Sequence, residues 1–313
     1  MTQIIKPNWS ESDIPVQDGK TILITGANIG LGYEAARMLS GRGAHVLMAC
    51  RNPARATAAR EAILAIHPTA RLDIVELDLG DLESVAQVPA KLATLGVGQI
   101  DALINNAGIM MPPRRMTTKQ GYEAQFGTNH LGHFALTRSM FALLTPSGRI
   151  VNVASIADRR ADINWDDVQW ERRYSPAAAY GQSKTANLLF TKALTKRLTA
   201  AGSGIIAAAA HPGISHTNLA ANSILGKWLW LFEPIIKLGL GPMIQSAAMG
   251  ALPEVYAATG DVEPGAYYGP SARTRGHPIR AEAHQAAHSN DPVSAERLWA
   301  LSEELTGGVF SVG

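Results

Sequence analysis

The chain has 313 residues, of which 46% are apolar and 17% charged, the composition of an ordinary globular domain that can bury a substantial core. A formal net charge of +2 gives no case for a nucleic-acid-binding surface. Cys50 is the only cysteine, so an intrachain disulfide is excluded and a reducing, cytoplasmic location is expected.

No stretch of the sequence has the properties of a membrane segment. Residues 1–20 carry polar side chains throughout and lack the apolar core of a signal peptide. The longest apolar run, from Leu225 to Leu240, is interrupted by charged residues, a proline and glycines, and it is shorter than the roughly 20 residues of a spanning helix. We expect no transmembrane helix, and we expect residues 1–18 to be a surface arm that leads into the first strand.

A glycine motif follows the first predicted strand. Residues 20–25 are rich in β-branched side chains, as in a buried parallel strand, and a helical pattern continues to about Arg42. Between them the chain reads Gly26-Ala27-Asn28-Ile29-Gly30-Leu31-Gly32, a G-x-x-x-G-x-G spacing. Glycines between a strand and a helix let backbone amides approach a pyrophosphate at the helix N-terminus. The alternative is a tight turn without a ligand.

The end of the second predicted strand indicates which dinucleotide is bound. Residues 44–50 form this strand, Arg51 and Asn52 follow it, and a helix runs from Pro53 to about residue 67. In dinucleotide-binding folds an acidic residue at this point binds the ribose 2′-hydroxyl, whereas an arginine suits a 2′-phosphate. Arg51 therefore favours NADP(H), with NAD(H) open as the second cofactor. The alternative for Arg51 is a solvated side chain at a strand end.

The remaining elements continue the alternation of strands and helices. Strands are predicted at 71–77, 101–104, 149–153 and 204–210, and helices at about 82–95, 119–144 and 176–200. This order predicts an α/β fold with a doubly wound (Rossmann) parallel sheet of about seven strands, formed by a single domain over residues 19–313. Candidate functional residues follow the strand ends, where such sheets bind ligands: Asp78 and Leu79, then Asn105, Ala107 and Gly108, then Ser155, then Pro212 and Gly213.

Tyr180 and Lys184 form the strongest candidate for acid–base chemistry. Four residues apart on one helix, their side chains share a face. A cation beside a phenol favours the phenolate, so we expect Lys184 to lower the pKa of Tyr180. His211 is interpreted as a loop residue. His130 and His133 have no acidic or cysteine partner at ligand spacing, so no metal site is predicted.

Taken in order, these motifs resemble the short-chain dehydrogenase/reductase family over roughly residues 19–270. The matching residues are Thr25 to Gly32, Asp78, Asn105 to Gly108, Asn129, Ser155, Tyr180 with Lys184, and Pro212-Gly213 with Thr217. Ser155 and Tyr180 are farther apart than is usual in the family, with an insertion from Ile163 to Pro176. This insertion is similar to the branch of retinol dehydrogenases, WW-domain oxidoreductase and protochlorophyllide reductase. The chain has no WW domain at its start and lacks the active-site cysteines of the light-driven reductase.

The resemblance implies a role for each residue of a catalytic tetrad. Tyr180 would be the general acid in carbonyl reduction, or the base in alcohol oxidation. Lys184 would bind the nicotinamide ribose, and Ser155 would hold the substrate oxygen and stabilise the charge that develops there. Asn129 would hold a water that links Lys184 to solvent. The implied cofactor contacts are Gly26, Asn28, Ile29, Gly30, Leu31, Gly32, Arg51, Asn52, Asp78, Leu79, Asn105, Ala107, Gly108, Tyr180, Lys184, Pro212, Gly213 and Thr217.

An aromatic segment after the sixth strand is the candidate substrate lid. Residues 218–240 include Leu225, Trp228, Trp230 and Phe232, which offer a large apolar surface. In the family this segment covers the active site. A helix packed on the core and a contact with a bilayer surface are the alternatives.

The predicted activity is an NADP(H)-dependent interconversion of an alcohol with an aldehyde or ketone, and the predicted substrate is apolar. An NAD-dependent enzyme of the same family and a non-catalytic dinucleotide-binding scaffold or redox sensor are the rival hypotheses. Family members often form homodimers through the helices that hold Asn129 and Tyr180. The sequence names neither the substrate nor the direction of the reaction.

Overall fold

A computed structural model describes residues 5–215 and 244–312. The predictions for Thr217 and for the lid at 218–240, with Leu225, Trp228, Trp230 and Phe232, lie outside the described residues. Within the described part no helix is both long and apolar enough to cross a bilayer.

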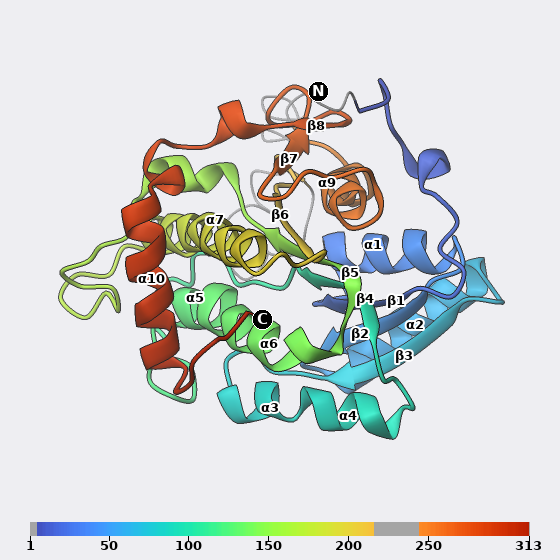
Figure 1. Ribbon diagram of the computed structural model, residues 1–313, viewed down its shortest axis with the longest axis horizontal. Coiled ribbons are helices and arrows are strands. Elements are labelled where there is room, and N and C mark those ends of the chain that lie inside the picture. The colour runs from blue at the N-terminus through green and yellow to red at the C-terminus, as the bar shows by residue number, and fades with distance from the viewer. Residues whose placement is uncertain (1–4, 216–243, 313) are drawn as a thin grey trace.

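A single sheet organises the described chain (Figure 1). Its eight described strands lie in the order β3-β2-β1-β4-β5-β6-β7-β8. The first seven are parallel and β8 is antiparallel to β7, so the predicted doubly wound parallel sheet is confirmed and extended by one hairpin strand. The strands are β1 (Thr21–Thr25), β2 (His45–Cys50), β3 (Arg71–Glu76), β4 (Ile100–Asn105), β5 (Leu144–Val153), β6 (Ile206–Ala210), β7 (Tyr267–Pro270) and β8 (Pro278–Arg280).

Helices cover both faces of the sheet (Figure 1). Alternate side chains of β1 enter two separate cores, because Leu23 packs into one cluster while Ile22 and Ile24 pack into the other. The face of Ile22 is covered by α1 (Gly30–Ser40), α2 (Pro53–Ile66) and α9 (Ala247–Thr259). The face of Leu23 is covered by α3 (Leu82–Ala86), α4 (Val88–Thr94), α5 (Ala124–Phe126), α6 (Gly132–Met140), α7 (Pro176–Ala200) and α10 (Pro292–Leu305).

Two predicted helices have different bounds in the structure. The helix expected at 82–95 is divided at Gln87, and Pro89 then occupies the first turn of α4, where its missing N–H costs no helical hydrogen bond. The helix expected at 119–144 begins only at α5, because the carboxylate of Glu123 accepts the amides of Gln125 and Phe126 and so caps it. A π-helical turn, Gly127–Leu131, then separates α5 from α6.

The residues that precede β1 are packed against the domain instead of extending from it. Trp9 and Ile14 are buried, and the ring of Trp9 meets that of Tyr256 edge-on with centroids 5.2 Å apart. His277 donates a hydrogen bond from Nδ1 to the carbonyl of Trp9. The segment therefore contributes apolar surface to the core beneath α9.

The C-terminal helix α10 covers the outer face of α7. Trp299 stacks on Phe310 at a centroid distance of 5.0 Å and meets Phe134 of α6 edge-on at 5.1 Å. The guanidinium of Arg197, on α7, lies 4.0 Å from the Trp299 ring centroid. An aromatic core thus joins α6, α7, α10 and the tail that follows α10.

Candidate active site

The sequence-predicted residues within the described chain converge on one edge of the sheet. Gly26 follows β1, Arg51 follows β2, and Asp78 lies two residues beyond β3. Asn105 ends β4, and Ser155 and Pro212 lie two residues beyond β5 and β6. Because these strands are parallel, their carboxyl ends meet at the same edge. The order of the strands reverses between β1 and β4, which is the switch point where such sheets bind ligands.

The glycine turn after β1 leaves the start of α1 available to an anion. Gly26 and Gly30 have φ of 69° and 60°, a region that suits residues without a side chain. A Cβ on Gly32 would lie 2.5 Å from the carbonyl oxygen of Gly26, so only glycine permits this close turn. Ile29 precedes α1 and offers no side-chain cap to its first amides. Free amides at a helix N-terminus fit the pyrophosphate of a dinucleotide.

The end of β2 presents a cation that has no partner among the described residues. Arg51 is exposed and forms no ion pair or side-chain hydrogen bond with any described residue. Asn52 caps α2 by accepting the amide of Arg55 at 3.0 Å, so its oxygen has a structural role beside the predicted cofactor contact. Beyond β3, the carboxylate of Asp78 accepts the amide of Gly80 at 2.8 Å. These strand-end loops are therefore held in defined conformations.

A hydrogen-bond network holds the loop after β4 against β1. Thr25 accepts the amides of Asn106 and Ala107 at its Oγ1, both at 2.9 Å. His133 donates from Nδ1 to the carbonyl of Asn129, so its Nε2 is the acceptor for the Thr25 hydroxyl at 2.9 Å. Burial lowers the pKa of His133 to about 4, which keeps the ring neutral as this network requires.

Asn129 fastens the same loop from the π-helical turn. Its Oδ1 accepts the amide of Ile109 at 2.8 Å, and its Nδ2 donates to the carbonyl of Ile109 and to Oγ of Ser183. Both donors and the acceptor are thus engaged with protein atoms. A water held by this side chain could donate to the second lone pair of Oδ1.

Tyr180 and Lys184 lie on consecutive turns of α7. Ser175 caps this helix and Pro176 occupies its first position, which fixes where the helix begins. Ser155 lies opposite, where its Oγ accepts the amide of Ala157, and its side chain is hydrogen-bonded to Tyr180. Ser155, Tyr180 and Lys184 are thereby brought together as predicted from the motif.

The charges of this group differ from the sequence-based expectation. Burial raises the pKa of Tyr180 to about 12, the hydrogen bond from Ser155 opposes this rise, and Lys184 makes no contribution. The expectation that Lys184 lowers this pKa is therefore wrong. Lys184 is itself buried, which lowers its pKa to about 8, and its Nζ lies 5.7 Å from the centroid of the Tyr180 ring. Its described hydrogen bond is to the carbonyl of Val153, at 3.0 Å.

Glu254 on α9 is a functional candidate that the sequence-based analysis missed. Its side chain is 2% exposed, and burial raises its pKa to about 8 while the charge of Lys184 acts in the opposite direction. An acid within the otherwise apolar stretch Ala251 to Ala258 was the available signal. Such an acid is costly to bury and is seldom found without a reason.

The loop after β6 forms the last side of this edge. Gly213 has φ of 65°, and a Cβ there would lie 2.2 Å from the carbonyl oxygen of Thr274 in the β7–β8 hairpin. His211 is fully buried, and its Nδ1 accepts the amide of Gly213 while its Nε2 lies 3.1 Å from Nδ1 of His284. His211 is thus a packed structural residue of the loop, in agreement with its interpretation from the sequence.

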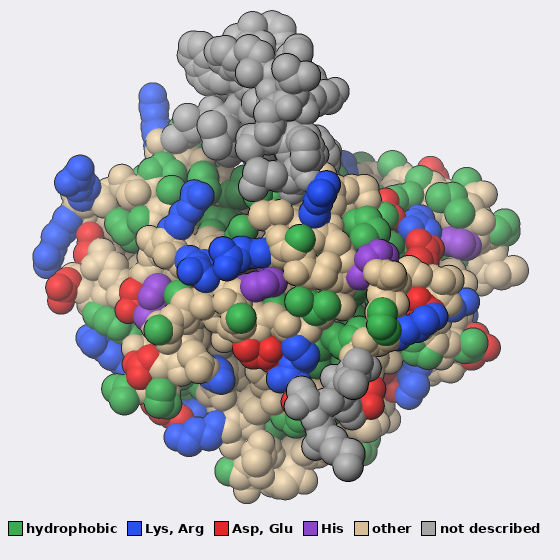
Figure 2. Space-filling view, turned by 90° about the horizontal axis from the view of Figure 1, so that it is seen from above, with side chains coloured by type: hydrophobic (Ala, Val, Ile, Leu, Met, Phe, Trp, Pro, Cys, Tyr) green, Lys and Arg blue, Asp and Glu red, His purple; other side chains and the backbone are tan. Residues whose placement is uncertain are grey.

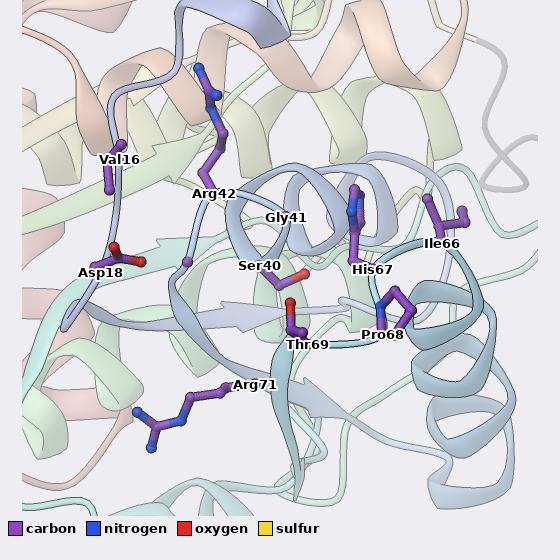
Figure 3. A pocket seen from close by; sticks show the side chains of 11 residues that line it. Val16, Asp18, Ser40, Gly41, Arg42, Ile66, His67, Pro68, Thr69 and Arg71 are labelled. Carbon is purple, nitrogen blue, oxygen red and sulfur yellow. The ribbon is translucent and has the colours of Figure 1, made fainter.

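A surface hollow of about 580 Å³ lies at the opposite edge of the sheet (Figure 3). Arg71, the first residue of β3, helps to line it together with Arg42 and His67. The side chains of Arg42 and Arg71 point away from each other in Figure 3. The face shown in Figure 2 carries basic and acidic side chains intermingled, in keeping with the small net charge. No cluster of potential metal ligands occurs among the residues that the structure describes.

Comparison with known proteins identifies the class. A family model for short chain dehydrogenase matches residues 20–227, about two thirds of the chain. The chain therefore belongs to the short-chain dehydrogenase/reductase family, whose members are oxidoreductases.

Individual relatives place the chain near the retinol dehydrogenases. It is 39% identical to retinol dehydrogenase 12 of Mus musculus over 295 residues, which covers 92% of this chain and 87% of that protein. It is 36% identical to retinol dehydrogenase 13 of Homo sapiens, covering 95% and 87% of the two chains. A crystal structure of an uncharacterized Mycobacterium paratuberculosis protein superposes with a TM-score of 0.80, at 41% identity and with 97% and 100% coverage. The predicted family and branch are confirmed.

Proposed function

We propose that the chain is an NADP(H)-dependent oxidoreductase that interconverts an alcohol with an aldehyde or ketone of an apolar substrate. The observation that supports this most strongly is the buried group at the strand-end edge, in which Ser155 is hydrogen-bonded to Tyr180 and Lys184 follows one turn later. Hydroxyl, phenol and amine in this arrangement suit proton transfer to a carbonyl oxygen.

A dinucleotide bound at this edge of the sheet would supply the hydride that the carbonyl carbon receives in the proposed reduction. Ser155 donates a hydrogen bond to the substrate oxygen and stabilises the negative charge that develops there. Tyr180 transfers its phenolic proton to this oxygen, which yields the alcohol. Lys184 orients the cofactor ribose and, when charged, favours the phenolate that Tyr180 leaves behind. Asn129 acts as a positioning residue, because it holds the loop after β4 through Ile109.

The state of Tyr180 favours reduction as the direction at neutral pH. With its pKa raised to about 12 by burial, the phenol of Tyr180 carries the proton that a general acid must deliver. The reverse reaction would require the phenolate, which burial disfavours. A nearby positive charge would have to stabilise that anion before alcohol oxidation could proceed.

Arg51 provides the first test of the cofactor assignment. A guanidinium that pairs with none of the described residues can form a charge-assisted fork with the 2′-phosphate of NADPH. Replacing Arg51 with alanine should weaken NADPH binding by about 10- to 100-fold, because hydrogen bonds to charged groups contribute about 1.5–3 kcal/mol. NADH affinity should change less than about threefold. Fluorescence titration of both cofactors measures the two dissociation constants.

A neighbouring arginine supplies the control for this experiment. Arg55 lies in the first turn of α2 and is also exposed, but it does not follow the strand end directly. Arg55→Ala should reduce NADPH affinity by much less than Arg51→Ala does. Equal affinity for NADPH and NADH that Arg51→Ala leaves unchanged would refute the assignment of NADP(H).

Turnover with a homologous aldehyde series tests the activity and the substrate class together. The relatives named retinol dehydrogenase motivate the choice of apolar substrates. With NADPH, kcat/KM should rise with chain length by roughly 1 kcal/mol or somewhat less per buried methylene. A flat series would contradict the apolar substrate. The absence of turnover with every aldehyde, ketone and alcohol would favour a non-catalytic scaffold.

The proposed enzyme does not use the outer face of α7 for dimerisation. Trp299 of α10 and the tail residue Phe310 already cover the apolar side chains there. Arg138 of α6 is likewise hydrogen-bonded to the tail, at the carbonyl of Thr306. A homodimer of the kind considered from the sequence would have to displace α10. Any homodimer is therefore proposed to form through other surfaces.

A further inference from the structure

Gln125 of α5 is a fully buried residue whose side chain the proposed mechanism does not use. Its Oε1 accepts the amide of Met111, in the loop after β4, at 2.7 Å. Its Nε2 donates to the carbonyl of Pro176, the first residue of α7, at 3.1 Å. Because one partner is a donor and the other an acceptor, the orientation of the carboxamide is fixed. A single side chain thus joins two segments that are distant in the sequence.

Tyr174 adds to this connection from the insertion that precedes α7. Its hydroxyl oxygen accepts a hydrogen bond from Nε2 of Gln125 at 3.1 Å. The same hydroxyl donates to the carbonyl of Pro112, in the loop after β4, at 3.4 Å. The insertion, the loop after β4 and the start of α7 therefore all meet at the carboxamide of Gln125.

Asn129 makes a parallel connection about one helical turn farther along. It too accepts an amide of the loop after β4, from Ile109, and donates to α7, at Oγ of Ser183. The residues that Gln125 and Asn129 bind on α7 are about two turns apart, and Tyr180 lies between them. The α5 helix and the π-helical turn after it pack against α7 (Figure 1). Two carboxamides thus bridge the loop and the helix that carries the proton donor.

The loop that these carboxamides bind passes next to the catalytic group. A Cβ on Gly108 would lie 3.8 Å from Nζ of Lys184 and 3.1 Å from Oδ1 of Asn129. Met111 has φ of 48°, a left-handed conformation that residues with a side chain rarely adopt. Such a conformation persists where surrounding contacts hold it, and the amide of Met111 is held by Gln125. The shape of this side of the site therefore depends on Gln125.

We propose that Gln125 is a positioning residue that sets the separation between residues 109–112 and the first turn of α7, and so places the substrate carbonyl against Tyr180. The catalytic consequence rests on the proposed function, whereas the connection itself does not. In the proposed reduction the substrate oxygen must lie within hydrogen-bond reach of both Ser155 and Tyr180. A misplacement of about 1 Å can lower the rate on the order of 10²-fold.

Hydrogen exchange tests the connection without reference to turnover. Gln125→Met preserves the side-chain volume and removes both the acceptor and the donors. Peptides that cover residues 109–112 and 174–179 should exchange at least about tenfold faster than in the unmodified chain. The peptide that contains Asn106 and Ala107 should exchange as before, because Thr25 holds both amides. Unchanged exchange in residues 109–112 and 174–179 would overturn the proposal.

Steady-state kinetics test the positioning role. In Gln125→Met, kcat for aldehyde reduction should fall by about 10- to 100-fold. The dissociation constant of NADPH should change by less than about threefold, because Thr25 and Asn129 hold the earlier part of the loop without Gln125. An unchanged kcat, or a loss of NADPH affinity as large as the loss of kcat, would overturn the positioning role.

Gln17 supplies the matched control. It is also buried, and its Nε2 donates to the carbonyls of Pro15 and Val16 in the segment that precedes β1. Gln17→Met should lower the melting temperature and leave kcat unchanged. A comparable loss of kcat in Gln17→Met would mean that the loss of any buried carboxamide has this effect, and the specific role of Gln125 would be wrong.

A second variant covers the case in which methionine disturbs packing. Gln125→Ala leaves room for water to bind the freed amide of Met111 and the freed carbonyl of Pro176. This variant should fold and show the same loss of kcat. Absence of turnover in the unmodified chain, with faster exchange in the variants, would contradict the proposed function and support the connection. An active enzyme in which neither variant changes exchange or kcat would contradict the role of Gln125 alone.

Discussion

Replacing Tyr180 with phenylalanine should lower kcat/KM by about 10²- to 10⁴-fold, the contribution typical of a positioned acid–base group. Tyr180 is buried, with 9% of its surface exposed. Phenylalanine preserves the ring and removes only the hydroxyl that is bonded to Ser155. The fold and the cofactor site should therefore survive. Circular dichroism and NADPH titration should match the unmodified chain while turnover is lost.

A second tyrosine controls for the loss of a phenolic hydroxyl. Tyr122 is half-buried and donates its hydroxyl proton to the carbonyl of Leu305, at the end of α10. Tyr122→Phe should lower stability slightly and change kcat/KM by less than about threefold. Near-normal kcat in Tyr180→Phe would mean that another group delivers the proton, and the proposed mechanism would be wrong.

Acidification should unfold the protein over a narrow range below neutral pH. Burial lowers the pKa of His130 and His211 to about 3 and that of His133 to about 4. Their usual value is near 6.5, so between about pH 6.5 and 4 the unfolded state binds more protons than the folded state. The contribution of these three rings to the free energy of unfolding is fully present above about pH 6.5. It is lost as the pH falls from there through the folded-state pKa values.

Glu254 offsets part of the pH dependence that the histidines cause. The balance determines how steeply the free energy of unfolding should change with pH. Its raised pKa makes the folded state bind an extra proton between about pH 4.5 and 8, so its contribution falls as the pH rises. Three histidines less Glu254 give about two more protons on the unfolded state than on the folded state. The raised pKa of Glu123 and the lowered pKa of His284 act in opposite directions. The free energy of unfolding should therefore drop by roughly 3 kcal/mol per pH unit from pH 6 to 4.5. Urea titrations across this range measure the slope.

One histidine variant tests the cause of the acid unfolding. His130 is fully buried, with Nε2 2.9 Å from Oγ of Ser302. His130→Gln keeps a polar group for Ser302 but cannot titrate, so the slope should fall by up to about 1.4 kcal/mol per pH unit. Above about pH 7.5 neither state protonates His130, so the difference in unfolding free energy between the two chains should not change with pH. This range serves as the internal control. An unchanged slope would show that His130 is already charged in the folded state.

The succession of strands and helices could be predicted because each βα unit has a recognisable local sequence pattern. The β-branched run before Gly26 and the helical pattern after it needed no tertiary information. The start of α5 depended instead on the Glu123 cap, and the π-helical turn has no periodicity of its own. The hairpin strand β8 is only three residues long, too short for a pattern to register. Boundaries set by caps and turns are less visible in sequence than a repeating apolar pattern.

The members of the site could be predicted, but their electrostatics could not. Strand-end positions and the spacing of Tyr180 and Lys184 placed both residues correctly. The sequence suggested that the lysine charge would dominate, whereas burial dominates in the folded chain and raises the pKa of Tyr180. Glu254 lies 70 residues beyond Lys184 and acts from the other side of the sheet. Only the folded structure brings such distant charges within range of each other.

We propose that the chain transfers hydride from NADPH to a carbonyl carbon with Tyr180 as the proton donor. Reduction of a long-chain aldehyde with NADPH deuterated at the transferred position of the nicotinamide ring tests this directly by mass spectrometry. We expect one deuterium on the carbinol carbon of the alcohol, which the unmodified chain should form about 10²- to 10⁴-fold faster than Tyr180→Phe. Tight binding of NADPH without any deuterated alcohol, or equal formation by the phenylalanine variant, would contradict the account.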